Sequence, residues 1–121
     1  MRVLVVEDEV LVAMLIEDML LDFGCSSVEV CGQIDAALAR LAEETFDFVI
    51  LDLNLEGEFT YPVADFLLER KISFVFATGY GSSMLTGPYA SIPALQKPFE
   101  MADIERVLRE VTPATSTDSP S

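Results

Sequence analysis

The sequence predicts an α/β fold in which a five-stranded parallel sheet carries helices on both faces. Short apolar runs of strand length alternate with longer segments whose apolar residues recur at helical spacing. The first run, residues 3–6, is continuously apolar, which suits a strand buried on both faces of a parallel sheet. Because parallel neighbours need crossover connections, this alternation favours an open sheet with helices on both faces.

The expected elements follow one another in regular order. The strands are expected at residues 3–6, 28–31, 46–51, 73–77 and 92–96. The helices are expected at residues 9–23, 34–41, 61–70 and 101–111. Gly24 ends the first helix, and Pro62 falls in the first turn of the third, where proline is tolerated. Between Ser82 and Tyr89 the helical pattern is poor and Gly87-Pro88 interrupts it, so the fourth helix of the alternation should be short or irregular.

Length and composition indicate one domain. The chain has 121 residues, of which 51% are hydrophobic, so it can bury a core of its own. We expect residues 1–111 to form this domain. Residues 112–121 are small and polar, and we expect a disordered tail there. From the start at Met1 and the polar tail we expect a complete, stand-alone domain, and a fragment of a longer protein is the alternative.

The charge balance restricts the partners. The chain has 7 Lys and Arg against 21 Asp and Glu, a formal net charge of −14. Such a surface repels nucleic acid and anionic lipid, so we expect no nucleic-acid and no membrane partner. It favours basic protein surfaces and divalent cations, although excess acid also serves solubility alone. No apolar run has spanning length, and Cys25 and Cys31 match no metal or redox spacing, so we expect reduced thiols and a cytoplasmic location.

Chemically capable residues gather where the expected strands end. Glu7 and Asp8 end the first strand, Asp52 the third, Thr78 follows the fourth and Lys97 follows the fifth. In such sheets, ligands bind outside the carboxyl ends of the strands, where the strand order reverses. The chain has no histidine, so these oxygen ligands suit a hard cation, above all Mg²⁺. A carboxylate beside Mg²⁺ can take up a phosphoryl group, and an ammonium and a hydroxyl can contact its oxygens.

In order and spacing, these motifs resemble the receiver domain of two-component response regulators. The resemblance covers residues 2–111. The matching segments are Val-Val-Glu7-Asp8-Glu9, Ile-Leu-Asp52-Leu-Asn54-Leu, Phe76-Ala-Thr78-Gly and Gln-Lys97-Pro98-Phe99. It implies the flavodoxin-like receiver fold and a Mg²⁺ site. In that site Asp8 and Asp52 bind the ion, Glu7 acts mainly through water, and Asn54 offers its backbone carbonyl.

The resemblance also implies the chemistry. Asp52 would be the phosphoacceptor, Thr78 and Lys97 would contact the phosphoryl group, and the Lys97–Pro98 peptide bond would be cis. The phosphoryl group would come from a sensor histidine kinase or a phosphotransfer protein. The domain would then hydrolyse its own phosphate, so we do not expect a turnover enzyme. A monomer or weak dimer is expected, acting on a downstream protein or as a phosphate sink.

One departure from the family pattern concerns the switch. Receivers usually have an aromatic residue three positions before the lysine, and here that position is Ala94. The run of residues 76–81, Phe-Ala-Thr-Gly-Tyr-Gly, resembles the FAT GUY subgroup of receivers. Its Tyr80 is a candidate to replace the missing aromatic and to control access of water, and the alternative is an ordinary loop tyrosine.

The first helix carries two sets of apolar residues. Those expected on its core face are Leu11, Leu15, Ile16, Met19, Leu20 and Phe23. A second stripe contains Val10, Met14 and Leu21, interrupted by Glu17 and Asp18. This stripe is either a broad core face or a docking surface for a kinase.

Two other functions remain as alternatives. A phosphatase of the haloacid dehalogenase type also uses an aspartate nucleophile at a strand end, but it needs a second carboxylate two residues further on. Asn54 occupies that position and cannot act as an acid or base. A receiver-like interaction module that is never phosphorylated is the other alternative, and the complete set of Asp52, Thr78 and Lys97 argues against it.

Overall fold

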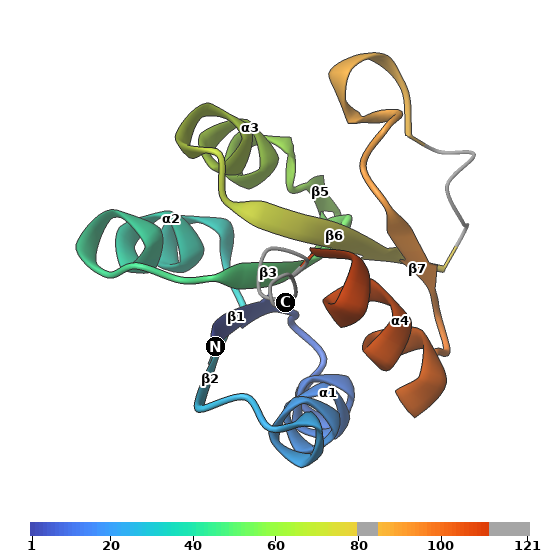
Figure 1. Cartoon of the computed structure of the whole chain (residues 1–121). Helices are drawn as coiled ribbons and strands as arrows, with labels where there is room; N and C mark the ends of the chain where they lie inside the picture. Colours follow the sequence, from blue (N-terminus) through green and yellow to red (C-terminus); the bar gives the residue numbers. More distant parts are fainter. Residues whose placement is uncertain (80–84, 112–121) are drawn as a thin grey trace, which may run out of the picture.

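The computed structural model describes residues 1–79 and 85–111 and confirms the predicted fold class. The central sheet is parallel and has five strands in the order β2-β1-β3-β6-β7. These strands are β1 (Arg2–Val6), β2 (Ser27–Cys31), β3 (Phe48–Asp52), β6 (Ser73–Thr78) and β7 (Ala94–Gln96). The α-helices are α1 (Val10–Phe23), α2 (Ile34–Glu43), α3 (Tyr61–Arg70) and α4 (Met101–Val111). They cover both faces of the sheet (Figure 1).

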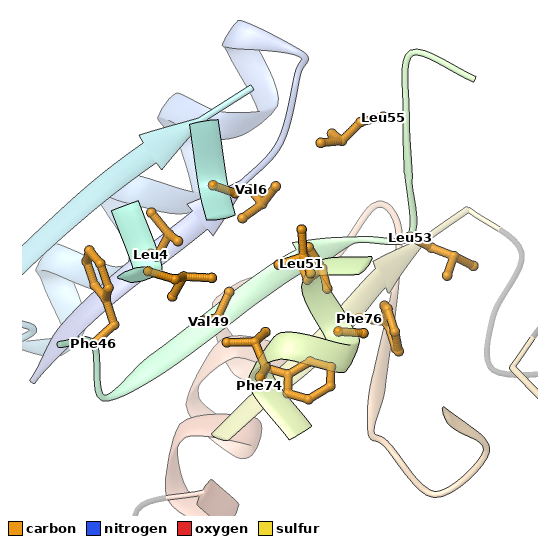
Figure 2. Close-up of a cluster of buried hydrophobic side chains, with 14 of the residues drawn as sticks. Leu4, Val6, Phe46, Val49, Leu51, Leu53, Leu55, Phe74 and Phe76 are labelled. Carbon is orange, nitrogen blue, oxygen red and sulfur yellow. The ribbon is translucent and has the colours of Figure 1, made fainter. Parts of the chain in front are cut away.

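Two hydrophobic layers hold the helices to the sheet. Alternate residues along each strand point to opposite faces, so the strands supply both layers. On one face Leu4, Leu51 and Phe76 pack with residues of α2 and α3 (Figure 2). On the other face Val5 and Ile50 pack with residues of α1 and α4. The continuous apolar runs of the sequence are therefore explained by burial on both sides.

Among the described residues of the connection between β6 and β7, the regular structure is a single 3-10 turn, η2 (Gly87–Tyr89), with Pro88 inside it. This agrees with the expectation of a short or irregular fourth helix, and Ser82 lies outside the described residues. The expected tail, residues 112–121, also lies outside them.

A two-stranded hairpin follows β3 and was not predicted. It consists of β4 (Asn54–Leu55) and β5 (Glu58–Phe59), paired antiparallel. Its two turn residues, Glu56 and Gly57, have φ values of 50° and 88°. Positive φ at both central positions is typical of the two-residue turns that match strand twist, and Gly57 makes one of them easy to adopt.

The expected core face of α1 was partly wrong. Leu11 is 81% exposed and Leu15 is 55% exposed, whereas Ala13, Ile16 and Leu20 are the buried residues of the helix. Because α1 is apolar on most of its circumference, spacing alone did not fix which residues face the sheet. The rotation of the helix is set by its packing against the sheet and against α4.

Two strands also begin two residues later than expected, while the other strand boundaries agree within one residue. The third strand begins at Phe48 rather than at residue 46. Asp47, just before it, donates its amide to the carbonyl of Arg2 and accepts a hydrogen bond from the amide of Arg2 through its carboxylate. The last strand begins at Ala94 rather than at residue 92, because the amide of Ile92 donates to Tyr89 in the preceding turn. No helix among the described residues is both long enough and apolar enough to cross a membrane.

Neighbouring leucines of α3 test the layered core. Leu67 is fully buried, whereas Leu68 is 38% exposed. We expect Leu67→Ala to lower the free energy of unfolding by about 2–5 kcal/mol, because it removes buried methyl groups and leaves a cavity. The matched change Leu68→Ala should cost less than about 1 kcal/mol. Urea unfolding followed by circular dichroism measures both, and similar losses for the two variants would contradict this packing.

Candidate functional site

The candidate site lies where the strand order reverses. β1 pairs with β2 on one side and with β3 on the other, so its carboxyl end adjoins both neighbouring strands. Residues that end β1 and β3 are thereby brought to one edge of the sheet. In open α/β sheets this edge is the usual place for a ligand.

Three carboxylates gather at this edge. Glu7, Asp8 and Asp52 each place a carboxylate oxygen within 4.8 Å of the others. Glu7 is 3% exposed and Asp52 is 7% exposed, whereas Asp8 is only half-buried. Carboxylate oxygens without nitrogen or sulfur ligands are the donor set preferred by Mg²⁺, so these residues fit that ion.

Lys97 neutralises part of this negative charge. Its Nζ donates to Glu7 Oε1 at 2.8 Å and to Asp52 Oδ2 at 3.1 Å. The backbone amide of Lys97 donates to the carbonyl of Thr78 at 2.8 Å, which fixes the start of the side chain beside β6. The Lys97–Pro98 bond is cis, as the resemblance implied. One ammonium therefore bridges the acids that end β1 and β3.

Burial and neighbouring charges change the pKa values of Asp52 and Lys97. Burial and the nearby Glu7 raise the pKa of Asp52 to about 6, although Lys97 and the amide of Asn54 act in the opposite direction. Burial alone would lower the pKa of Lys97, but its hydrogen bonds and charge interactions with Glu7 and Asp52 outweigh this and raise it. Lys97 therefore stays protonated, while Asp52 is ionised at a cost.

Thr78 and Asn54 lie at the same cleft. The cleft has a volume of about 740 Å³, and its lining includes Asp8, Asp52, Asn54, Thr78 and Lys97. Thr78 is the last residue of β6 and is buried. The side-chain oxygen of Asn54 accepts from the amide of Gly57 at 3.0 Å, and its own amide donates to Asp52 at 3.3 Å. These five predicted site residues are therefore assembled around one cavity, and Glu7 is joined to them through its hydrogen bond from Lys97.

The predicted partner and switch residues are less completely placed. Met14 is 54% exposed and lines a shallow depression with Glu7 and Asp8. Leu21 is 47% exposed and lies two turns further along α1. Pro98 is exposed and lines a second depression between α1 and the loop before α4. Tyr80 lies outside the described residues, so its predicted role stays a prediction.

Two residues of this region were missed from the sequence. Phe59 of the hairpin lines the cleft, and Thr60 donates its hydroxyl to the carbonyl of Asp52 at 2.6 Å. The pair Glu56-Gly57 was a usable signal for a turn. Nothing local in the sequence indicated that the hydroxyl of Thr60 would point back to β3.

The fold and the acidic site together define the class of protein. Residues 3–109 match the family model of the response regulator receiver domain, and the chain belongs to this family. It is therefore a receiver domain of two-component signalling. Receiver domains of this family bind Mg²⁺ at an acidic site, and this chain has an acidic cluster of Glu7, Asp8 and Asp52 at the edge of its sheet.

Particular relatives add detail. The chain is 29% identical over 115 residues to the sensory transduction protein LytR of Staphylococcus haemolyticus, covering 92% of this chain but only 45% of LytR. It is 40% identical to the solution structure of SdrG from Sphingomonas melonis, with a TM-score of 0.81 and coverage of 91% and 94% of the two chains. TrrA from Thermotoga maritima, solved in complex with Mg²⁺ and beryllofluoride, has a TM-score of 0.80 at 22% identity, with coverage of 91% and 97%.

The raised pKa of Asp52 predicts a pH-dependent stability. Between about 4 and 6 the folded state keeps a proton that the unfolded state has lost, so stability falls as the pH rises through this range. Asp52→Asn cannot ionise. We therefore expect the free energy of unfolding of this variant, measured in EDTA relative to the wild type, to increase between about pH 4 and pH 6. The increase should be on the order of 2 kcal/mol.

Urea unfolding at several pH values measures this advantage. Asp22→Asn, at an exposed position of α1, is the control and should keep the pH dependence of the wild type. An advantage of Asp52→Asn that is the same below pH 4 and above pH 6 would show that the carboxyl is not destabilised by its surroundings.

Proposed function

We propose that Asp52 is the phosphoacceptor of this receiver domain and that Lys97 and Thr78 contact the transferred phosphoryl group. The position of Asp52 carries the proposal. Its carboxylate is buried at the carboxyl edge of the sheet, adjoins two further acids, and accepts a hydrogen bond from Lys97. A nucleophile, a cation and a hydroxyl around one cavity are the parts that phosphoryl transfer needs.

The acid cluster is proposed to hold Mg²⁺ through Asp8, Asp52 and the backbone carbonyl of Asn54, with Glu7 acting mainly through water. When bound, the ion neutralises charge on the phosphoryl oxygens. Lys97 would then turn from its two acidic partners toward a phosphoryl oxygen. The structure of SdrG in a beryllofluoride-activated conformation, 40% identical to this chain, supports this assignment by analogy.

The proposed reaction is a transfer from a phosphohistidine. A carboxylate oxygen of Asp52 attacks the phosphorus, the phosphorus–nitrogen bond breaks, and the imidazole nitrogen keeps the electron pair and takes up a proton. Water later attacks the phosphorus of the acyl phosphate and releases inorganic phosphate, which restores the carboxylate. The protein is thus a self-phosphorylating and self-dephosphorylating switch rather than a turnover enzyme.

The alternative functions fit these residues less well. A phosphatase of the haloacid dehalogenase type needs an acid or base two residues after its nucleophile, and Asn54 there is engaged with Gly57 through its side chain. A module that is never phosphorylated would not need Lys97 and Thr78 at the same cavity as Asp52. Family membership and the site together favour the phosphoacceptor.

The subgroup and the location belong to the proposal as well. Residues 76–81 support membership of the FAT GUY subgroup, with Tyr80 acting in place of the aromatic that Ala94 lacks. Cys25 and Cys31 are free thiols, which fits the cytoplasm, where two-component phosphotransfer takes place.

Receiver domains interact with histidine kinases, and we propose that α1 provides the docking surface here. Val10, Met14 and Leu21 are 69%, 54% and 47% exposed, so they expose apolar area without a partner from the sheet. Met14 adjoins the acids of the site. A partner that covers this stripe would bring its phosphohistidine close to Asp52.

Labelling tests the phosphoacceptor. Incubation with Mg²⁺ and acetyl phosphate should add the mass of one phosphoryl group to the wild type, and Asp52→Asn should abolish this addition while keeping the fold. Asp22→Asn should be labelled like the wild type, since it changes a carboxyl away from the site. Intact-mass spectrometry measures the addition. If the wild type takes up no phosphoryl group, the interaction module becomes the better account.

Charge on α1 tests the docking surface. Met14→Glu and Leu21→Glu should slow phosphotransfer from the cognate kinase about tenfold, a loss of about 1.4 kcal/mol, because they place charge in an apolar contact. Labelling by acetyl phosphate should not change, since no kinase is involved.

The kinase is found first by phosphotransfer profiling against the kinases of the source organism. Leu68→Glu is the matched control, because it makes the same change at a partly exposed position on the other face of the sheet. Unchanged phosphotransfer and unchanged stability in both α1 variants would rule out this surface.

A further inference from the structure

Thr60 is a buried polar residue without a role in the proposed chemistry. It is 0% exposed. In the part of the chain that the structure describes, the buried polar and charged residues are Glu7, Asp52, Thr60 and Thr78. The other three belong to the candidate site. A fully buried hydroxyl is normally hydrogen-bonded, so the hydrogen-bond partner of Thr60 indicates what this residue does.

The hydroxyl of Thr60 does not cap the helix that it precedes. Thr60 is the N-cap residue of α3, where a threonine oxygen usually accepts from an amide of the first turn. Here the helix has no side-chain cap, and the amides of Val63 and Ala64 donate to the backbone carbonyl of Thr60. The hydroxyl instead donates to the carbonyl of Asp52 at 2.6 Å and approaches that of Leu53 at 3.2 Å.

A second bond strengthens this connection. The amide of Thr60 donates to the carbonyl of Leu53 at 3.0 Å, and the amide of Leu53 donates to Ala77 of β6 at 2.9 Å. The segment between Asp52 and Thr60 is therefore closed at its base, with the β4–β5 hairpin inside it. The peptide that links Asp52 to Leu53 is held from both sides, its carbonyl by the hydroxyl of Thr60 and its amide by the carbonyl of Ala77.

We propose that Thr60 is a positioning residue for phosphoryl transfer. Its hydroxyl fixes the backbone of Asp52 and Leu53, so it sets the direction of the Asp52 carboxylate and of the Asn54 carbonyl. This inference rests on the proposed function of Asp52. Groups that orient metal ligands in this way commonly change metal affinity by about 10–100-fold when they are removed.

Thr60→Val tests the hydroxyl, because it keeps the shape of the side chain and removes the donor. We expect the dissociation constant for Mg²⁺ to rise about tenfold, and labelling by acetyl phosphate at a Mg²⁺ concentration near the wild-type constant to slow similarly. Thr60→Ser, which keeps the hydroxyl, should restore both. Thr45→Val makes the same change at an exposed threonine before β3 and should match the wild type.

NMR titration of the folded variants with Mg²⁺ measures the affinity, and urea unfolding in EDTA measures stability separately. A purely structural role would lower the unfolding free energy of Thr60→Val and leave the Mg²⁺ affinity and labelling rate of its folded form unchanged, which would overturn the inference. A wild type that neither binds Mg²⁺ nor is labelled would overturn the proposed function itself.

Thr60→Ala gives a second comparison if Thr60→Val does not fold. Alanine and serine are both smaller than threonine, so their difference isolates the hydroxyl. Weaker Mg²⁺ binding in Thr60→Ala than in Thr60→Ser supports the positioning role. Equal Mg²⁺ affinities and equal labelling rates in the two variants would contradict it.

Discussion

The crowding of negative charge at the carboxyl edge of the sheet is the constraint on which the site depends. Glu7 and Asp52 are almost fully buried beside Asp8, and like charges in such a place repel strongly. Lys97 offsets part of this repulsion through its bonds to both buried acids. The remaining charge favours a cation, and burial together with the nearby Glu7 keeps the pKa of Asp52 high. The folded state therefore loses some stability at the site for which phosphoryl transfer is proposed.

The sheet topology holds these charged residues close together. β1 and β3 are neighbours, so Glu7 and Asp52 meet, while Lys97 extends from the end of β7 across β6. All five residues of β3 are buried, and helices cover both faces of the sheet. The two apolar layers therefore hold the strand ends in place. On mobile loops, the same carboxylates would move apart because like charges repel.

An aromatic stack connects the segment after Asp52 with the turn before β7. Phe59 stacks on Tyr61 with ring centroids 5.2 Å apart, and Tyr61 stacks on Tyr89 of η2 at 4.4 Å. Tyr89 in turn forms a T-shaped pair with Phe76 and donates its hydroxyl to Asp65 at 2.6 Å. Although Ala94 is not aromatic, rings therefore do fill the space between the hairpin, α3 and the core. Tyr61, Phe76 and Tyr89 belong to the hydrophobic layer that includes residues of α2 and α3.

The sequence by itself determined the alternation of strands and helices and the polar residues at the strand ends. Strands that are buried on both faces require continuous apolar runs, and a parallel sheet brings the carboxyl ends of its strands to one edge. Only the tertiary structure decided which side of α1 faces the sheet, because Leu11 and Ile16 are equally apolar in sequence. It also decided that Thr60 bonds Asp52 rather than its own helix. Both depend on contacts between segments distant in the chain, and local spacing contains no information about such contacts.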